Sequence, residues 1–132
     1  MNLDFIYSLN NYINSLNLYA ESYVGILDVS DSISVIATPG GINQIYYDGV
    51  RDQDYNIQFT TKSKNQSLCV DALNTIMNRI LLVNDIPSLN DSYTFNRMIV
   101  GSPPSFIGTD EQGYFVWQLS STAKLTINQG VI

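Results

Sequence analysis

The stretch that decides the fold reads YNIQFTTKSKNQSLCVDALNTIMNRILL and occupies residues 55–82. Residues 55–62 alternate between side chains suited to burial and polar ones, which is typical of a half-buried strand. From Leu68 to Leu81 the apolar residues recur at helical spacing, which predicts one continuous apolar face. Because such a strand and helix bury each other's apolar faces, the stretch predicts the nucleus of an α+β domain.

Elements on either side of this stretch follow from the same patterns. Residues 2–18 predict a first helix with Asn2 as its N-cap, and the central helix is expected at residues 67–83. Strands are expected at residues 33–37, 45–47, 55–62 and 93–100, with one bent strand or a strand pair at 114–127. We therefore expect a single domain, residues 1–132, in which a mixed or antiparallel sheet of four to five strands packs against two helices.

Clusters of proline and glycine divide the predicted elements. Residues 38–41, Thr-Pro-Gly-Gly, are expected to form a turn or loop, because proline lacks a backbone donor and glycine tolerates positive φ. Residues 102–105, Ser-Pro-Pro-Ser, predict a stiff loop that carries Phe106 and Ile107 as an apolar tip. Residues 110–113, Asp-Glu-Gln-Gly, predict a turn with Gly113 in the left-handed conformation.

The chain carries few charges, and most of them are acidic. Charged residues make up 14% of the sequence and the net charge is −6, whereas about 25% is typical of globular proteins. Nucleic-acid binding and adhesion to anionic membranes need clustered Lys and Arg, so both are disfavoured. Because the cores of interfaces are depleted in charge, the composition favours a protein that assembles with others, with AT-rich codon bias as the alternative.

Targeting signals are not apparent at the start of the sequence. The first residues have no basic region followed by an uninterrupted apolar stretch, which a signal peptide would require. No apolar run approaches the roughly eighteen residues of a membrane span. We therefore expect a protein that is made and folded in a cytoplasm, with no membrane partner.

No catalytic or metal-binding constellation stands out. The sequence has no histidine, which removes the commonest general base and metal ligand. Cys69 is the single cysteine and lies on the apolar face of the predicted helix, as a core residue does. Asp48, Asp52 and Asp54 could form an acid pair or a calcium loop, but their spacing differs from the EF-hand pattern and favours a solvated hairpin. We expect no catalytic residue, no metal and no cofactor.

Aromatic side chains near turns are candidate contact residues, since aromatic anchors are enriched at interface centres. One group precedes Gly49 and the other follows the double proline, and core packing is the alternative for both. Arg97 alternates with Tyr93 and Phe95, so it either pairs with a carboxylate across the sheet or at a subunit boundary, or lies on a solvent face. The candidate interaction residues are Tyr46, Tyr47, Arg51, Arg97, Pro103, Pro104, Phe106 and Ile107.

Two longer strings carry a family resemblance. They are DYNIQFTTKSKNQSLCVDALNTIMNRI at residues 54–80 and LNDSYTFNRMIVGSPPSFIGTDEQGYFVWQLSSTAKLTI at residues 89–127. Together they resemble the minor capsid or tail terminator proteins of long-tailed bacteriophages that infect Gram-positive bacteria. The features that carry the resemblance are the strand-to-helix junction IQF..KS.NQ and the pattern Y.F......PP..I..DE.G..VW.L, and neither has a catalytic meaning.

The resemblance implies a structural virion protein, not an enzyme, that forms a homo-oligomeric ring, typically a hexamer. Such a ring caps the finished tail tube, stops its polymerisation and provides the surface to which the head attaches. The implied partners are the tail tube protein and a head-completion protein, and the implied location is the head–tail interface of the virion. Genomic DNA would pass without specific binding, so Asp28, Asp31 and Asp48 are candidate residues of an acidic lumen.

Two other interpretations stay open. Another neck component, such as a head-completion or stopper protein, would differ mainly in the purified partner that it binds. A small ligand- or metal-binding module would use Asp48, Asp52 and Asp54, or a pocket between helix and sheet.

Overall fold

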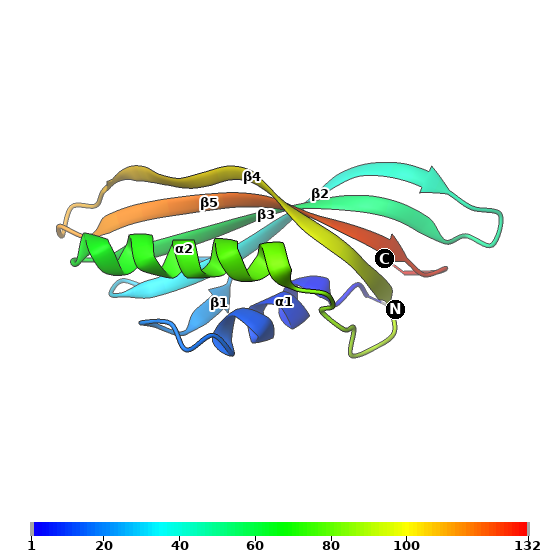
Figure 1. Cartoon of the computed structure of the whole chain (residues 1–132), viewed down its shortest axis with the longest axis horizontal. Coiled ribbons are helices and arrows are strands. Elements are labelled where there is room, and N and C mark those ends of the chain that lie inside the picture. The colour runs from blue at the N-terminus through cyan, green and yellow to red at the C-terminus, as the bar shows by residue number, and fades with distance from the viewer. Residues whose placement is uncertain (1, 132) are drawn as a thin grey trace.

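The computed structural model describes residues 2–131. Within them the chain forms two helices and one five-stranded sheet (Figure 1). The elements in chain order are α1 (Phe5–Asn14), β1 (Ser22–Val24), β2 (Ser32–Ile45), β3 (Arg51–Ser63), α2 (Gln66–Leu82), β4 (Tyr93–Thr109) and β5 (Phe115–Ile127). The expected α+β class, with a mixed sheet packed against two helices, is confirmed.

One face of the sheet is covered by both helices. The strands lie in the order β1-β2-β3-β5-β4, with β1 parallel to β2 and all other neighbours antiparallel. Side chains from α1, α2 and the helix-facing side of the strands form a single buried cluster. Burying one large apolar side chain contributes roughly 1.5–3 kcal/mol. The largest fully buried side chains are Phe5, Phe59, Leu9, Ile13, Ile33, Ile57, Leu73, Ile76, Ile80, Ile86, Leu119 and Leu125.

The central prediction, a strand that leads into an amphipathic helix, is confirmed with shifts at the ends. β3 begins earlier than predicted because its first residues pair with both neighbouring strands, Arg51 with Ile45 and with Ile127. α2 starts and ends one residue earlier than predicted. Its N-cap is Asn65, whose side chain accepts a hydrogen bond from the backbone N of Ser67 at 3.2 Å.

The first helix is confirmed, but it is shorter than predicted. Phe5, Leu9 and Ile13 are buried. The helix ends at Asn14. The side chain of Asn14 accepts a hydrogen bond from the backbone N of Ser22 and donates one to the carbonyl oxygen of Ser22. These two bonds join the end of α1 to β1, a strand that the sequence pattern did not predict.

The predicted N-cap of the first helix, Asn2, is wrong. Asp4 occupies that position without a side-chain capping bond. Its carboxylate instead accepts hydrogen bonds from Ser88 Oγ at 2.7 Å, from Leu89 N at 2.8 Å and from Ser92 Oγ at 2.9 Å. The residue therefore joins the start of α1 to the segment before β4.

The Thr-Pro-Gly-Gly segment does not end the first long strand. β2 continues through it from Ser32 to Ile45, with irregular register against β3 between Pro39 and Ile42. A β-bulge absorbs the extra residues while pairing resumes beyond it. Residues 45–47 are consequently not a separate strand, because Ile45 ends β2 and the next two residues belong to the turn.

The double proline likewise does not form a loop. β4 runs from Tyr93 to Thr109, with register shifts on both sides of Pro103 and Pro104. Proline is tolerated there because β4 is an edge strand. Phe106 and Ile107 therefore lie on a strand rather than on a loop tip.

A further bulge in β4 breaks the strict alternation that placed Arg97 on the same side of the strand as Tyr93 and Phe95. Phe95 pairs with Leu125 and Arg97 pairs with Lys124, so Asn96 is the extra residue. The bulge places Met98 in the core and leaves Arg97 exposed.

The C-terminal segment forms one continuous strand. β5 runs from Phe115 to Ile127 in regular register with β3. Of the two predicted alternatives, one strand is therefore correct and a strand pair is not. Gly113 precedes it with φ of +86°, which confirms the predicted left-handed turn residue. Neither α1 nor α2 is long and apolar enough to cross a membrane.

Candidate assembly surfaces

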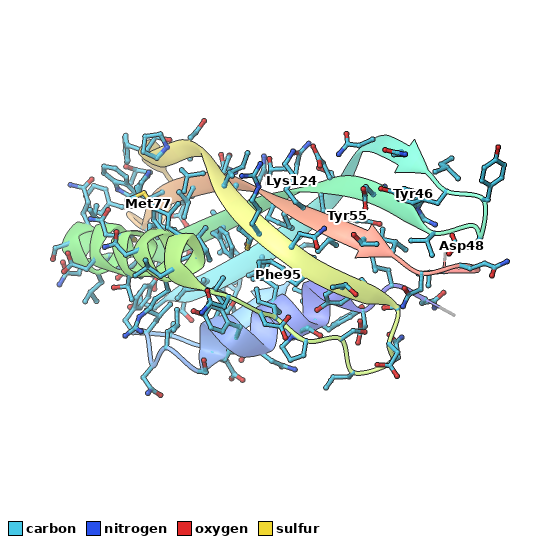
Figure 2. The ribbon with its side chains drawn as sticks, turned by 45° about the vertical axis from the view of Figure 1, so that its right-hand side comes forward. Tyr46, Asp48, Tyr55, Met77, Phe95 and Lys124 are labelled. Carbon is cyan, nitrogen blue, oxygen red and sulfur yellow. The ribbon has the colours of Figure 1, made fainter. Side chains whose placement is uncertain are left out.

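The end of the β2–β3 hairpin extends beyond the helices and forms what we call the hairpin arm, residues 42–51 (Figure 1). Figure 2 shows Tyr46 and Asp48 at this end of the molecule. Four apolar or aromatic side chains of the arm are exposed, and Tyr47 is fully exposed. They are Ile42, Ile45, Tyr46 and Tyr47. Aromatic side chains on an ordered support are suited to act as anchors in an interface.

Hydrogen bonds order the turn of the arm. The Tyr46 hydroxyl donates to Asp52 Oδ2 at 2.9 Å, which raises the pKa of this tyrosine. Asp48 Oδ1 accepts from the backbone N of Val50 at 3.1 Å. Gly49 has φ of +84°, a conformation that favours glycine. The tip is therefore a defined turn.

Arg51 fixes the base of the arm to the C-terminal turn. Its Nε donates to Gln53 Oε1 at 2.8 Å and its Nη1 donates to the carbonyl oxygen of Val131 at 3.3 Å. Among the predicted interaction residues, Arg51 is thus engaged within the chain, whereas Tyr47 of the same hairpin is exposed.

A second exposed group lies at the opposite end of the sheet. Phe106 and Ile107 are 50% and 57% exposed. The Phe106 ring lies 5.7 Å from the Trp117 ring and 6.4 Å from the Phe115 ring, measured between centroids. Phe106 is therefore held by aromatic neighbours on one side and presents the rest of its ring to solvent.

Polar and charged side chains occupy the sheet face that no helix covers. Lys124 Nζ lies 2.8 Å from Asp54 Oδ2, and Asn43 Nδ2 donates to Asp54 Oδ1 at 2.8 Å. The hydrogen bond from Lys124 lowers the pKa of Asp54 against the effect of burial, and the nearby Arg97 lowers it further. Figure 2 marks Lys124 on this face. Arg97 has no carboxylate within salt-bridge distance in residues 2–131, so the predicted pair across the sheet does not form within the chain.

The three aspartates considered for a metal or acid pair do not converge. Asp48 bonds its own turn, Asp54 bonds Lys124, and Asp52 accepts from Thr126 Oγ1 at 2.8 Å. In the part of the chain that the structure describes, no group of three His, Cys, Asp or Glu could hold a metal ion. The arrangement favours a surface hydrogen-bond network.

The candidate lumen residues also lie apart. Asp28 and Asp31 precede the start of β2, and Asp48 follows its end. A strand of 14 residues spans roughly 45 Å at about 3.3 Å per residue. Asp28 and Asp31 therefore share one end of the molecule, while Asp48 belongs to the hairpin arm at the other.

The sheet thus carries ordered, exposed apolar groups at both of its ends. Comparison with known families gives a match over residues 12–127 to the model described as bacteriophage tail terminator protein. The chain belongs to the bacteriophage tail terminator family. It is a structural component of the phage tail and of the virion. A search of curated proteins gave no match.

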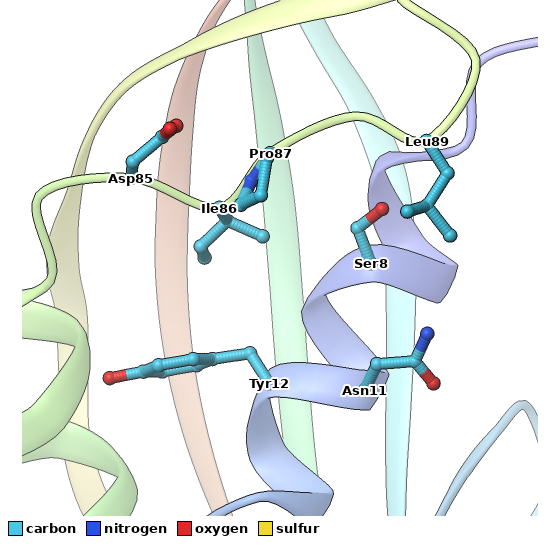
Figure 3. Close-up of a pocket in the computed structure, with 7 residues that line it drawn as sticks. All are labelled: Ser8, Asn11, Tyr12, Asp85, Ile86, Pro87 and Leu89. Carbon is cyan, nitrogen blue, oxygen red and sulfur yellow. The ribbon is translucent and has the colours of Figure 1, made fainter.

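An apolar hollow of the tail terminator lies between α1 and the segment before β4 (Figure 3). It has a volume of about 290 Å³, and its walls come from α1 and residues 85–89 rather than from the sheet. The hydroxyl of Ser8 in its wall is buried and has no hydrogen-bond partner within residues 2–131. The lining residues are Ser8, Asn11, Tyr12, Asp85, Ile86, Pro87 and Leu89.

Sequence patterns missed two parts of the tail terminator's surface. Ile42 was not identified because the glycine pair before it suggested a loop, although its helix-facing position follows from pairing with Gln53. Leu81 and Leu82 at the end of α2 are 53% and 78% exposed, so the prediction that Leu81 belongs to the buried apolar face is wrong. Ile80, Leu81 and Leu82 are three consecutive apolar residues, and a helix cannot place all three on one narrow face. This run could have indicated that the two leucines are exposed.

Proposed function

We propose that this tail terminator forms a ring, most simply a hexamer, at the head–tail interface of a long-tailed phage of Gram-positive bacteria. The ring caps the tail tube, stops its polymerisation and presents a surface for the head. The observation that carries the proposal is the pair of exposed apolar groups at the two ends of the strands, the hairpin arm and the Phe106 end. A protein that joins two partners along one axis needs two such surfaces.

The tail tube protein and a head-completion protein are the proposed partners of the two ends. Each end carries an aromatic side chain held by its neighbours, Tyr46 by Asp52 and Phe106 by Trp117. Because hot-spot residues are most often aromatic and lie on ordered supports, each end suits a protein partner. The arm carries Arg51 as its one basic residue, and at the Phe106 end Lys62, which lies beside Lys64 over the Tyr114 ring, pairs with Asp110 at 3.0 Å. This balance of charge does not favour nucleic acid.

Charge supports a ring through which DNA passes without specific binding. At −6 per chain, six copies carry −36. Like charge around a lumen repels the phosphate backbone and prevents adhesion. Asp28 and Asp31 at one end and Asp48 at the other are the residues that we propose to face the lumen at its two openings.

The mass of the purified protein over a concentration series, measured by light scattering with and without tail tubes, tests this proposal. We expect a species of about six chains, either in solution or on the tubes. A protein that stays monomeric in solution and does not bind tail tubes would contradict the proposal. Binding to a head-completion protein without binding to tubes would favour another neck component.

A further inference from the structure

Two strand edges of the sheet are open over part of their length. β4 is the last strand on one side, so one of its edges has no neighbouring strand among residues 2–131. On the other side, β1 pairs only with residues 33–35 of β2, which leaves residues 36–45 unpaired there. Unpaired backbone donors and acceptors on an edge are templates for pairing with another chain.

The register places these open edges in the same half of the molecule. Two rows of paired residues cross the sheet from β2 to β4 in that half. They are Ile42, Gln53, Leu125 and Phe95, and then Ile45, Arg51, Ile127 and Tyr93. In the right-hand half of Figure 1, β2 and β4 lie on opposite sides of β3 and β5. The two open edges therefore face in opposite directions at the same height along the strands.

In the other half, which we call the closed half, β1 covers residues 33–35 of β2 and two prolines interrupt the edge of β4. Val35 of β2 is covered by Val24 of β1, and on its other side it pairs with Phe59. The same row continues to Leu119 and reaches β4 at the irregular segment between residues 102 and 105. That segment contains the double proline, which has no backbone N–H to donate. The edge of β4 is thus blunted at the height where β1 covers β2.

Strand direction suits pairing between copies. β2 and β5 run one way, and β3 and β4 run the other way. When a second copy is set beside the first in the same orientation, its β2 lies against β4 of the first and runs antiparallel to it, which is the more stable arrangement. Such a contact joins two different surfaces, and contacts of this kind form rings when the rotation closes.

Side chains at the open edges match in character. Ile42 and Ile45 are 52% and 67% exposed, and both share rows with inward-facing residues. On β4 the same rows end in Phe95 and Tyr93, whose rings lie 6.3 Å and 5.3 Å from the ring of Phe5. Because cross-strand neighbours point to the same face, the isoleucines of one copy would extend the aromatic cluster of the next.

We infer that β4 of one copy pairs with β2 of the next through residues 93–95 and 42–45, so that the sheets of the ring are continuous. The inference rests on the proposed ring and adds the surfaces that meet in it. Pro39 has no backbone N–H, which confines the pairing to the part of β2 beyond the bulge. The occupant of each edge is a second copy of this chain.

Photo-cross-linking in the assembled ring tests this contact. A benzophenone side chain is placed at Thr94, which is exposed on the open part of β4, and in a control at Ser105, which is exposed on the closed part. Light scattering on the same samples first establishes that rings have formed. We expect a covalent dimer from the Thr94 position, with the attachment mapped by mass spectrometry to residues 42–45, and no such product from Ser105.

The outcomes separate the inference from the proposed function. Rings in which the Thr94 probe attaches elsewhere, or nowhere on a second copy, would overturn the edge pairing and leave the ring intact. Equal attachment to β2 from Ser105 would also overturn it, because the closed half would then be the contact. Absence of rings even on tail tubes would overturn the proposed function and, with it, the pairing.

Discussion

At the scale of single residues, Asp4 joins elements that are far apart in the sequence. Its carboxylate accepts hydrogen bonds from Ser88, Leu89 and Ser92. Burial alone would raise the pKa of this carboxyl, but the hydrogen bonds outweigh burial and hold the pKa below its ordinary value. The ionised form is therefore favoured in the folded state relative to the unfolded chain.

Removal of this carboxylate should weaken folding near neutral pH. We expect Asp4→Ala to lower the free energy of unfolding by about 1–3 kcal/mol, since partners of a charged acceptor lose their bonds. Chemical denaturation at pH 7 measures the loss, with Asp71→Ala on the exposed face of α2 as the control. Equal losses in both variants would contradict the role given to Asp4.

The same carboxylate predicts an acid dependence of stability. A carboxyl with a depressed folded-state pKa stabilises the fold above its unfolded pKa of about 3.9, and the contribution is lost as pH falls through the folded-state value. Asp4 and Asp54 both have lowered pKa values. We expect the denaturant concentration at the unfolding midpoint to decrease as the pH is lowered below 4. This decrease should be less steep in Asp4→Ala than in the unmodified protein. If the midpoint of the variant decreased with pH as steeply as that of the unmodified protein, Asp4 would not contribute to the acid dependence.

At the scale of elements, Gly40 permits the bulge that carries β2 past the proline. A Cβ placed on Gly40 would lie 2.5 Å from the carbonyl oxygen of Asp54, whereas one on Gly41 would have no heavy atom within 4 Å. We expect Gly40→Ala to destabilise the protein by about 1–3 kcal/mol through this steric conflict, and Gly41→Ala to cost much less. Thermal denaturation of the two variants measures the difference, and similar melting temperatures would refute this explanation.

The cap of α2 is a second element-scale determinant. The side chain of Asn65 accepts from the backbone N and the hydroxyl of Ser67. Asn65→Ala should lower the free energy of unfolding by about 1 kcal/mol. Asn74→Ala on the exposed side of the same helix should cause no loss, because alanine has the higher helix propensity. Urea denaturation of both variants measures these changes. If Asn65→Ala lowered the free energy of unfolding no more than Asn74→Ala, the capping role of Asn65 would be contradicted.

Local patterns predicted the elements that depend on neighbours in sequence. The core of β3 and the buried face of α2 follow from periodicity alone. Whether Phe59 or Ile76 is buried depends on its position in the repeat of its own strand or helix. β1, the extension of β2 and the bulge at Asn96 could not be predicted in this way, because they depend on pairing with strands that are distant in sequence. Tyr46 and Tyr47 of the arm were identified by residue type, but the hydrogen bond from Tyr46 to Asp52 was not.

At the scale of the whole molecule, the hairpin arm and the Phe106 end are proposed to bind different partners. Tyr47 makes the sharpest test of the arm, because its full exposure means that its loss should not affect folding. We expect Tyr47→Ser to keep the melting temperature and to weaken binding to the partner of the arm by about 2 kcal/mol, as for a hot-spot residue. Tyr7→Ser, on the exposed side of α1, is the matched control. Equal binding by both variants in a pull-down titration would remove the arm from the interface.

The most direct measurement of the proposed function is the length of tail tubes that polymerise in the presence of this protein. Purified tail tube protein is allowed to grow on preformed tubes, and lengths and tube ends are recorded by negative-stain electron microscopy. We predict that addition of the protein stops elongation and leaves a ring at the capped ends. Tubes that grow to the same lengths with and without the protein, and that carry no ring, would contradict its role as the terminator.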